Sequence, residues 1–115
     1  MAAANNYAAS LISLQRFKEV RSLLRKTIPV ARRVLGESNE LTLRMKALYA
    51  RALYRADDAT LDDLCEAVTT LEDAGRIARR VMGGAHPLTV DIEDELRDAR
   101  AALRARETPP PPRSA

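Results

Sequence analysis

The chain has 115 residues, is rich in alanine, leucine, arginine and glutamate, and carries a formal net charge of +3. Valine, isoleucine and aromatic residues are sparse, so the composition favours helices and argues against a β-sheet. The single cysteine, Cys65, excludes an internal disulfide, and with His86 as the one histidine it leaves little for a Cys/His metal site.

The N-terminal hairpin is predicted from two apolar stripes. Residues at helical spacing predict helices over 5–15 and 17–35. Gly36 follows the second helix, at the position that favours a left-handed residue. Pro29 lies inside that helix, and we expect either a kink near Arg25 or a break at Ile28.

The next two helices are predicted over 39–56 and from Thr60 to about residue 82. Asn39 is a candidate N-cap, and Thr60 with Asp63 resembles a capping box. Gly83 and Gly84 end the fourth helix. Cys65 belongs to the apolar stretch of this helix and is expected to pack in the core.

A fifth helix is predicted from Pro87 to about residue 106, because proline favours the first turn of a helix. Its first half is acidic and its second half basic, which complements the helix dipole. One apolar stripe and one charged face are typical of a helix that closes a stack. The domain is therefore predicted over 5–106, followed by a Pro-rich, disordered tail over 107–115.

An internal repeat relates the two hairpins. The segment 31–36, Ala-Arg-Arg-Val-Leu-Gly, recurs 47 residues later at 78–83, and 41–43 recurs at 88–90 with the same offset. The segment 7–11 resembles 49–53 at an offset of 42. The simplest account is a 42-residue unit whose second copy has five extra residues around 55–60, between two helices.

Several segments resemble the tetratricopeptide repeats of the kinesin-light-chain type. The run 82–89, Met-Gly-Gly-Ala-His-Pro-Leu-Thr, is similar to that family's Leu-Gly…His-Pro…Thr pattern, and 35–42 repeats it with Asn39-Glu40 in place of His-Pro. The segment 16–20 and Asn6-Tyr7-Ala8 resemble the starts of the family's second and first helices. The resemblance covers about residues 5–90. It implies an all-α fold, a fragment of an α-solenoid with about two antiparallel hairpins of 42–47 residues and a C-terminal capping helix.

In that family the first helix of each unit lines a concave groove that binds peptides, and an Asn of this helix contacts the peptide. The resemblance implies this role for Asn6, while Leu48 takes the same place in the second unit. Positions opposite the buried faces of the first and third helices give the candidate groove residues Asn6, Ala9, Ser13, Lys46, Arg51 and Arg55. The second set is basic, so an acidic peptide is the expected ligand; solvated arginines without a partner are the alternative.

The predicted function is thus a non-catalytic scaffold or adaptor that binds a protein or peptide. We expect no enzyme activity, no cofactor and no metal, because His86 falls in a repeat turn and the paired carboxylates fall in first turns of helices. No apolar run is long enough to span a membrane, and the start lacks the features of a signal peptide, so a cytoplasmic protein is expected.

Two charge blocks leave the partner open. Among the charged residues of the stretch 16–35, seven are basic and one is acidic. The stretch 57–73 has seven acidic residues and no basic residue. The two blocks are expected to pair within one molecule or between copies in a homo-oligomer. A basic helix can also bind nucleic acid, but the scarcity of aromatic residues and the acidic block argue against it.

Overall fold

The computed structural model describes residues 1–13 and 16–107. Within these ranges the chain forms five helices and no strand, which confirms the all-α prediction: α1 (Ala2–Ser13), α2 (Phe17–Val34), α3 (Glu40–Tyr54), α4 (Leu61–Met82) and α5 (Pro87–Glu107). The predicted helix bounds agree to within a few residues. Glu107 still belongs to α5, and residues 108–115 of the predicted tail lie outside the described residues.

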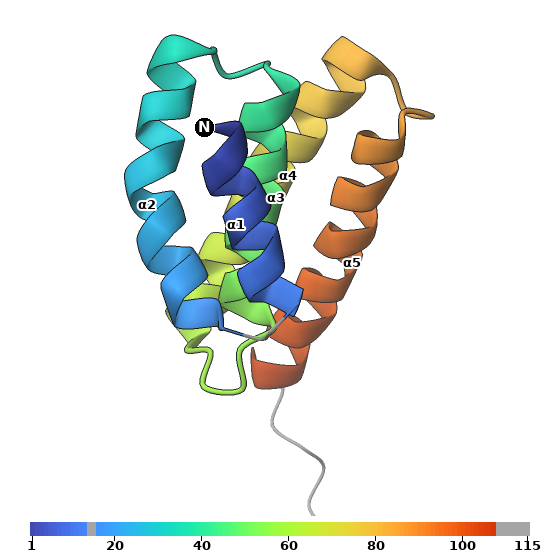
Figure 1. Cartoon of the computed structure of the whole chain (residues 1–115). Coiled ribbons are helices and arrows are strands. Elements are labelled where there is room, and N and C mark those ends of the chain that lie inside the picture. The colour runs from blue at the N-terminus through green and yellow to red at the C-terminus, as the bar shows by residue number, and fades with distance from the viewer. Residues whose placement is uncertain (14–15, 108–115) are drawn as a thin grey trace, which may run out of the picture.

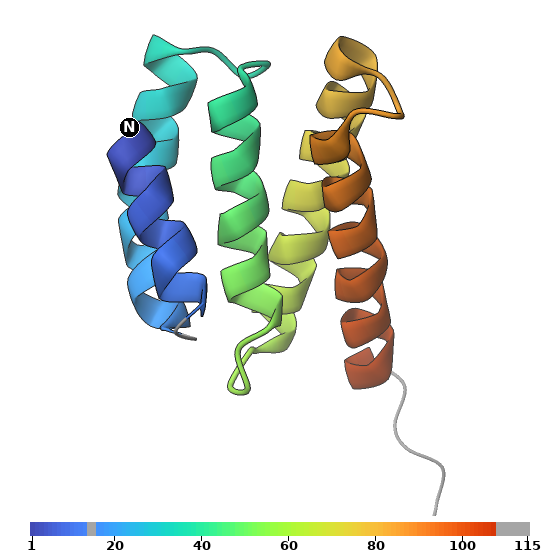
Figure 2. The same cartoon turned by 45° about the vertical axis from the view of Figure 1, so that its right-hand side comes forward.

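The helices form two successive antiparallel hairpins, α1–α2 and α3–α4, with α5 packed beside them (Figure 1, Figure 2). α3 is the central helix, because it contacts α1, α2, α4 and α5. Most of its residues are buried, among them Leu43, Met45 and Leu53. None of the helices in the described ranges is long and apolar enough to cross a membrane.

The predicted residues that cap the helices at Asn39, Thr60 and Gly36 are confirmed. The Asn39 side-chain oxygen accepts a hydrogen bond from the Leu41 N–H at 2.8 Å, as an N-cap does. The capping box at the start of α4 is complete, because Thr60 accepts from the Asp63 N–H and Asp63 accepts from the Thr60 N–H. Gly36 has φ 96°, the left-handed conformation that a glycine adopts without strain after a helix.

Pro29 does not end α2. The helix is continuous from Phe17 to Val34, so the predicted alternative of a break at Ile28 is wrong. Leu24 and Ile28 before the proline and Ala31 after it are all buried in the core. Because packing fixes both halves of the helix, it offsets the one backbone hydrogen bond that proline cannot make.

Residues 55–60, around which the sequence places the extra residues of the second unit, form the connection between α3 and α4. Ala56 and Ala59 of this connection are buried, and Arg106 donates a hydrogen bond to the Ala59 carbonyl at 2.6 Å. The insertion therefore packs against the end of α5.

The basic and acidic blocks meet within one molecule. Lys18 and Asp58 lie 4.0 Å apart, Arg21 and Asp63 3.5 Å, and Arg25 and Glu66 4.0 Å. These pairs are long or exposed, and each contributes at most about 1 kcal/mol. They join α2 to α4 and the loop before it, which is the intramolecular alternative left open by the sequence.

Candidate functional site

The first helices of the successive units, α1, α3 and α5, enclose a hollow of about 210 Å³, here called the first-helix groove. Its floor is apolar, because Ala47, Leu48 and Leu88 are buried there. Its other lining residues are Asn5, Ala9, Arg44, Arg51, Asp91 and Glu95. The groove thus combines an apolar floor with charges of both signs.

Glu95 of α5 organises one end of this groove. Its carboxylate accepts hydrogen bonds from Arg51 Nε at 2.9 Å and Arg55 Nη2 at 3.0 Å, and from the Tyr54 hydroxyl. The Glu95 side chain is only 9% exposed. Burial, together with the bond to the Glu95 carboxylate, raises the pKa of Tyr54. The cluster ties α5 to α3.

The predicted groove residues do not all meet. Arg51 lines the first-helix groove, and Arg55 lies beside it, joined to the same carboxylate of Glu95. Asn6 is exposed on α1, and its neighbour Asn5 lines the groove instead. Ser13 is the last residue of α1, and its side chain lies outside the described part of the chain.

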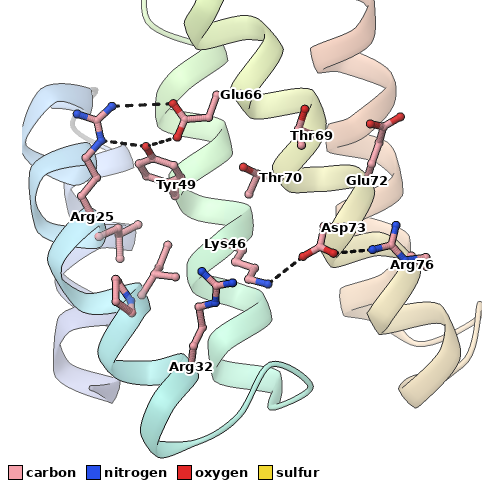
Figure 3. Close-up of a pocket in the computed structure, with 13 residues that line it drawn as sticks. Arg25, Arg32, Lys46, Tyr49, Glu66, Thr69, Thr70, Glu72, Asp73 and Arg76 are labelled. Carbon is pink, nitrogen blue, oxygen red and sulfur yellow. Dashed lines mark hydrogen bonds and ion pairs between the residues drawn. The ribbon is translucent and has the colours of Figure 1, made fainter.

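Lys46 lies elsewhere, in a larger hollow of about 520 Å³ between α2 and α4, here called the second-helix groove (Figure 3). Its ammonium group contacts Glu37 at 2.9 Å and Asp73 at 3.1 Å, and the residue is buried. The predicted basic cluster of Lys46 with Arg51 and Arg55 is therefore not formed, since successive turns of α3 point Lys46 and Arg51 to opposite grooves.

The second-helix groove also holds a contact between the two units. Arg25 Nε donates to the Tyr49 hydroxyl at 3.0 Å, and this hydroxyl donates to Glu66 at 2.6 Å (Figure 3). The Arg25 guanidinium lies 5.9 Å from the centre of the Tyr49 ring. Burial and the bond to Glu66 raise the pKa of Tyr49. Arg25 belongs to the first unit, whereas Tyr49 and Glu66 belong to the second.

Glu95 and Asn5 were missed by the sequence prediction. Glu95 stands 47 residues after Leu48, which is the offset of the repeat. The repeat therefore could have predicted Glu95 as the groove residue of a third unit. Asn5 is the residue next to the predicted Asn6, and nothing in the sequence indicates which of the two asparagines lines the groove. Its side-chain oxygen is buried and has no hydrogen-bond partner among the described residues.

His86 and Cys65, the residues with the most reactive side chains, lie in different surroundings. His86 Nδ1 accepts a hydrogen bond from the Leu88 N–H at 3.1 Å, at the start of α5. Cys65 is exposed, so the expected core position is wrong: it follows the buried Leu64 by one residue, which turns it outward. In the described ranges no group of three or more His, Cys, Asp or Glu side chains is placed to hold a metal ion.

Comparison of the chain with family models, with curated proteins and with solved structures finds no match. The resemblance to tetratricopeptide repeats of the kinesin-light-chain type therefore stays a prediction that rests on the residues quoted for it.

Proposed function

We propose that this chain is a non-catalytic protein-interaction module of tetratricopeptide type, which holds a short segment of a partner protein in the first-helix groove. The observation that carries the proposal is the make-up of this groove. Three helices contribute to it, its floor of Ala47, Leu48 and Leu88 is apolar, and charged side chains surround the floor. An apolar floor with a few oriented polar groups is typical of binding sites.

The charges favour an acidic segment at one end of the groove. Arg51 and Arg55 share the single carboxylate of Glu95, so two positive charges face one negative charge. Within the described ranges, Arg44, also on α3, has one ion-pair partner, the exposed Glu40 at 2.7 Å. Asp91 on α5 has the opposite sign. An acidic side chain of the partner therefore finds its complement on the α3 side of the groove.

A titration followed by NMR tests this proposal. The isotope-labelled chain is mixed with a short acidic peptide and, separately, with a basic peptide of the same length. We expect the acidic peptide to shift the amide signals of Arg44, Leu48 and Arg51. If neither peptide shifts signals along the groove, the proposal is wrong.

Arg44→Glu is the variant of choice, because Arg44 is exposed and lies outside the buried cluster around Glu95. We expect it to weaken binding of the acidic peptide about tenfold, which corresponds to about 1.4 kcal/mol. Arg33→Glu is the matched control, since Arg33 is exposed on α2 and has no ion-pair partner in the described residues. Equal affinities of the two variants would contradict the assignment of the groove.

A further inference from the structure

The two hairpins present equivalent faces to very different surroundings. By the offset of 42 in the first helix, Tyr7 corresponds to Tyr49, and by the offset of 47 in the second, Val30 corresponds to Ile77. Tyr49 and Ile77 are each 7% exposed, whereas Tyr7 is 55% and Val30 37% exposed. The face of the second unit that holds Tyr49 and Ile77 is thus covered, whereas the equivalent face of the first unit is open.

The face around Tyr49 is covered through hydrogen bonds between the two units. Arg25 of the first unit donates to the Tyr49 hydroxyl at 3.0 Å, and that hydroxyl donates to Glu66 at 2.6 Å. The arginine comes from the preceding hairpin, and the tyrosine and glutamate from the hairpin that receives it. One guanidinium therefore meets a ring face, a hydroxyl and a carboxylate at the boundary between units.

The receiving half of this contact recurs in the first unit. Tyr7 and Glu19 stand at the positions of Tyr49 and Glu66, at offsets of 42 and 47. The Tyr7 hydroxyl has no partner in the described part of the chain. Glu19 pairs with Arg16 across one turn of an exposed helix surface. Such an exposed ion pair contributes little to stability. Another arginine can therefore replace Arg16 as the partner of Glu19.

We propose that the outer face of α1–α2, which holds Tyr7, Glu19 and Val30, docks a further helical hairpin of the same repeat type. That hairpin supplies an arginine to Tyr7 and Glu19, as α1–α2 supplies Arg25 to Tyr49 and Glu66. This surface is separate from the first-helix groove, so docking of a hairpin there does not depend on the proposed peptide binding.

A second copy of this chain is a poor occupant of the same face. Lys26 and Arg33 lie on α2 without an ion-pair partner among the described residues, and joining two such faces would bring like charges together. The chain's own remaining hairpin face, on α3–α4, is covered by α5. The occupant is therefore a helical hairpin other than the two hairpins of this chain.

An extended chain supplies such a hairpin. Residues 1–42, one full repeat, are duplicated ahead of Met1, and Tyr7→Trp in the original unit provides a reporter, because the chain has no tryptophan. We expect the tryptophan emission to shift to shorter wavelength relative to the unextended Tyr7→Trp chain. Without the reporter substitution, we expect one thermal transition at a higher Tm than with a scrambled extension of the same length and composition. Unchanged emission, or a Tm equal to that of the scrambled control, overturns the proposal.

Two substitutions test the arginine. In the extended chain, Arg25→Met in the added unit should lower Tm, and this loss should shrink when Tyr7→Phe is also made in the original unit. An equal loss in both backgrounds overturns the contact. Light scattering of the natural chain completes the test: we expect a monomer, and a dimer that Val30→Arg dissociates would make a second copy the occupant and overturn the proposal.

Discussion

α3 and α5 follow helices that end at or beside a glycine of positive φ, Gly36 before α3 and Gly83 before α5. Each helix then begins with a side chain that accepts the N–H two residues later, Asn39 for α3 and His86 for α5. Each buries a threonine at its third residue, Thr42 or Thr89. The two starts, 47 residues apart, are therefore the same local structure built with different side chains.

The surroundings of these two helices differ. Among the helices of the described ranges, α3 contacts all four others, whereas α5 contacts only α3 and α4. The ion pairs differ in the same way: buried Lys46 on α3 contacts half-exposed Glu37 and Asp73, and on α5 it is the carboxylate Glu95 that is buried. Local sequence thus determines where a helix begins, and its place in the stack determines which polar contacts are buried.

Breaking the contact between α5 and α3 should have the largest effect. Glu95→Gln removes the charge that balances Arg51 and Arg55 and weakens the acceptor of the Tyr54 hydroxyl. Because these groups are partly buried, we expect a loss of about 3 kcal/mol in the free energy of unfolding, measured by urea denaturation.

The matched control is Glu93→Gln, on the same helix. Glu93 forms a more exposed pair with Arg79 at 3.0 Å, so we expect a much smaller loss than for Glu95→Gln. Equal losses for the two variants would mean that burial does not set the strength of the Glu95 contacts.

The two caps give the next largest effect. Asn39→Ala and His86→Ala each leave one N–H of a first turn without its acceptor, and each should cost about 1 kcal/mol. Because α3 is central, we expect Asn39→Ala to lower the global stability measured in urea. At the start of α5, His86→Ala should mainly accelerate local hydrogen exchange.

His86→Asn copies the cap of α3 and should retain the exchange protection of the natural chain. If His86→Asn exchanges as fast as His86→Ala, the imidazole does not act as the cap of α5.

The start of α3 should depend on pH in a way that the start of α5 does not. Glu37 precedes α3, and the equivalent residue before α5 is Gly84, which carries no charge. Hydrogen bonds from Lys46 and then Arg32 lower the pKa of Glu37. A lowered folded-state pKa means that the stabilisation is present above the ordinary pKa of glutamate and is lost as the pH falls through the folded-state value. Since Glu37 is half-exposed, we expect Glu37→Gln to cost less than about 1 kcal/mol at pH 7.

The cost of Glu37→Gln should shrink as the pH falls below the ordinary pKa of glutamate, about 4.3. It should vanish only below the lowered folded-state pKa, where the natural chain also loses the charge. Urea denaturation of both chains over a pH series measures this difference. A difference that is constant across the series would show that the charge of Glu37 is not its source.

The sequence predicted what is local or repeated. The helices, the Asn39 cap, the capping box of Thr60 and the position of the insertion all follow from short patterns. Pairing of the two charge blocks was predicted as one of two alternatives. Continuity of α2 through Pro29 was not decided by sequence, because it depends on packing from both sides of the helix.

The groove was predicted less well for a related reason. Lys46 and Arg51 share a helix and a charge, and only the packing of α2, α4 and α5 around α3 shows that they face different grooves. Arg51 and Arg55 are neutralised in part by Glu95, a residue more than 40 positions away in sequence. Composition and charge count cannot reveal such a long-range partner.

A gain in stability is expected from a feature that the two helix starts share. The hydroxyls of Thr42 and Thr89 are fully buried and have no hydrogen-bond partner among the described residues. An unpaired buried hydroxyl costs free energy, so replacing it with a methyl group of similar size should stabilise the fold. We expect Thr42→Val and Thr89→Val each to raise the free energy of unfolding by up to about 1 kcal/mol. Thr→Ser at either position keeps the hydroxyl, removes a buried methyl group and should destabilise by about 1 kcal/mol. Urea denaturation of the four variants measures both signs, and a loss for the valine variants would show that these hydroxyls are bonded in solution.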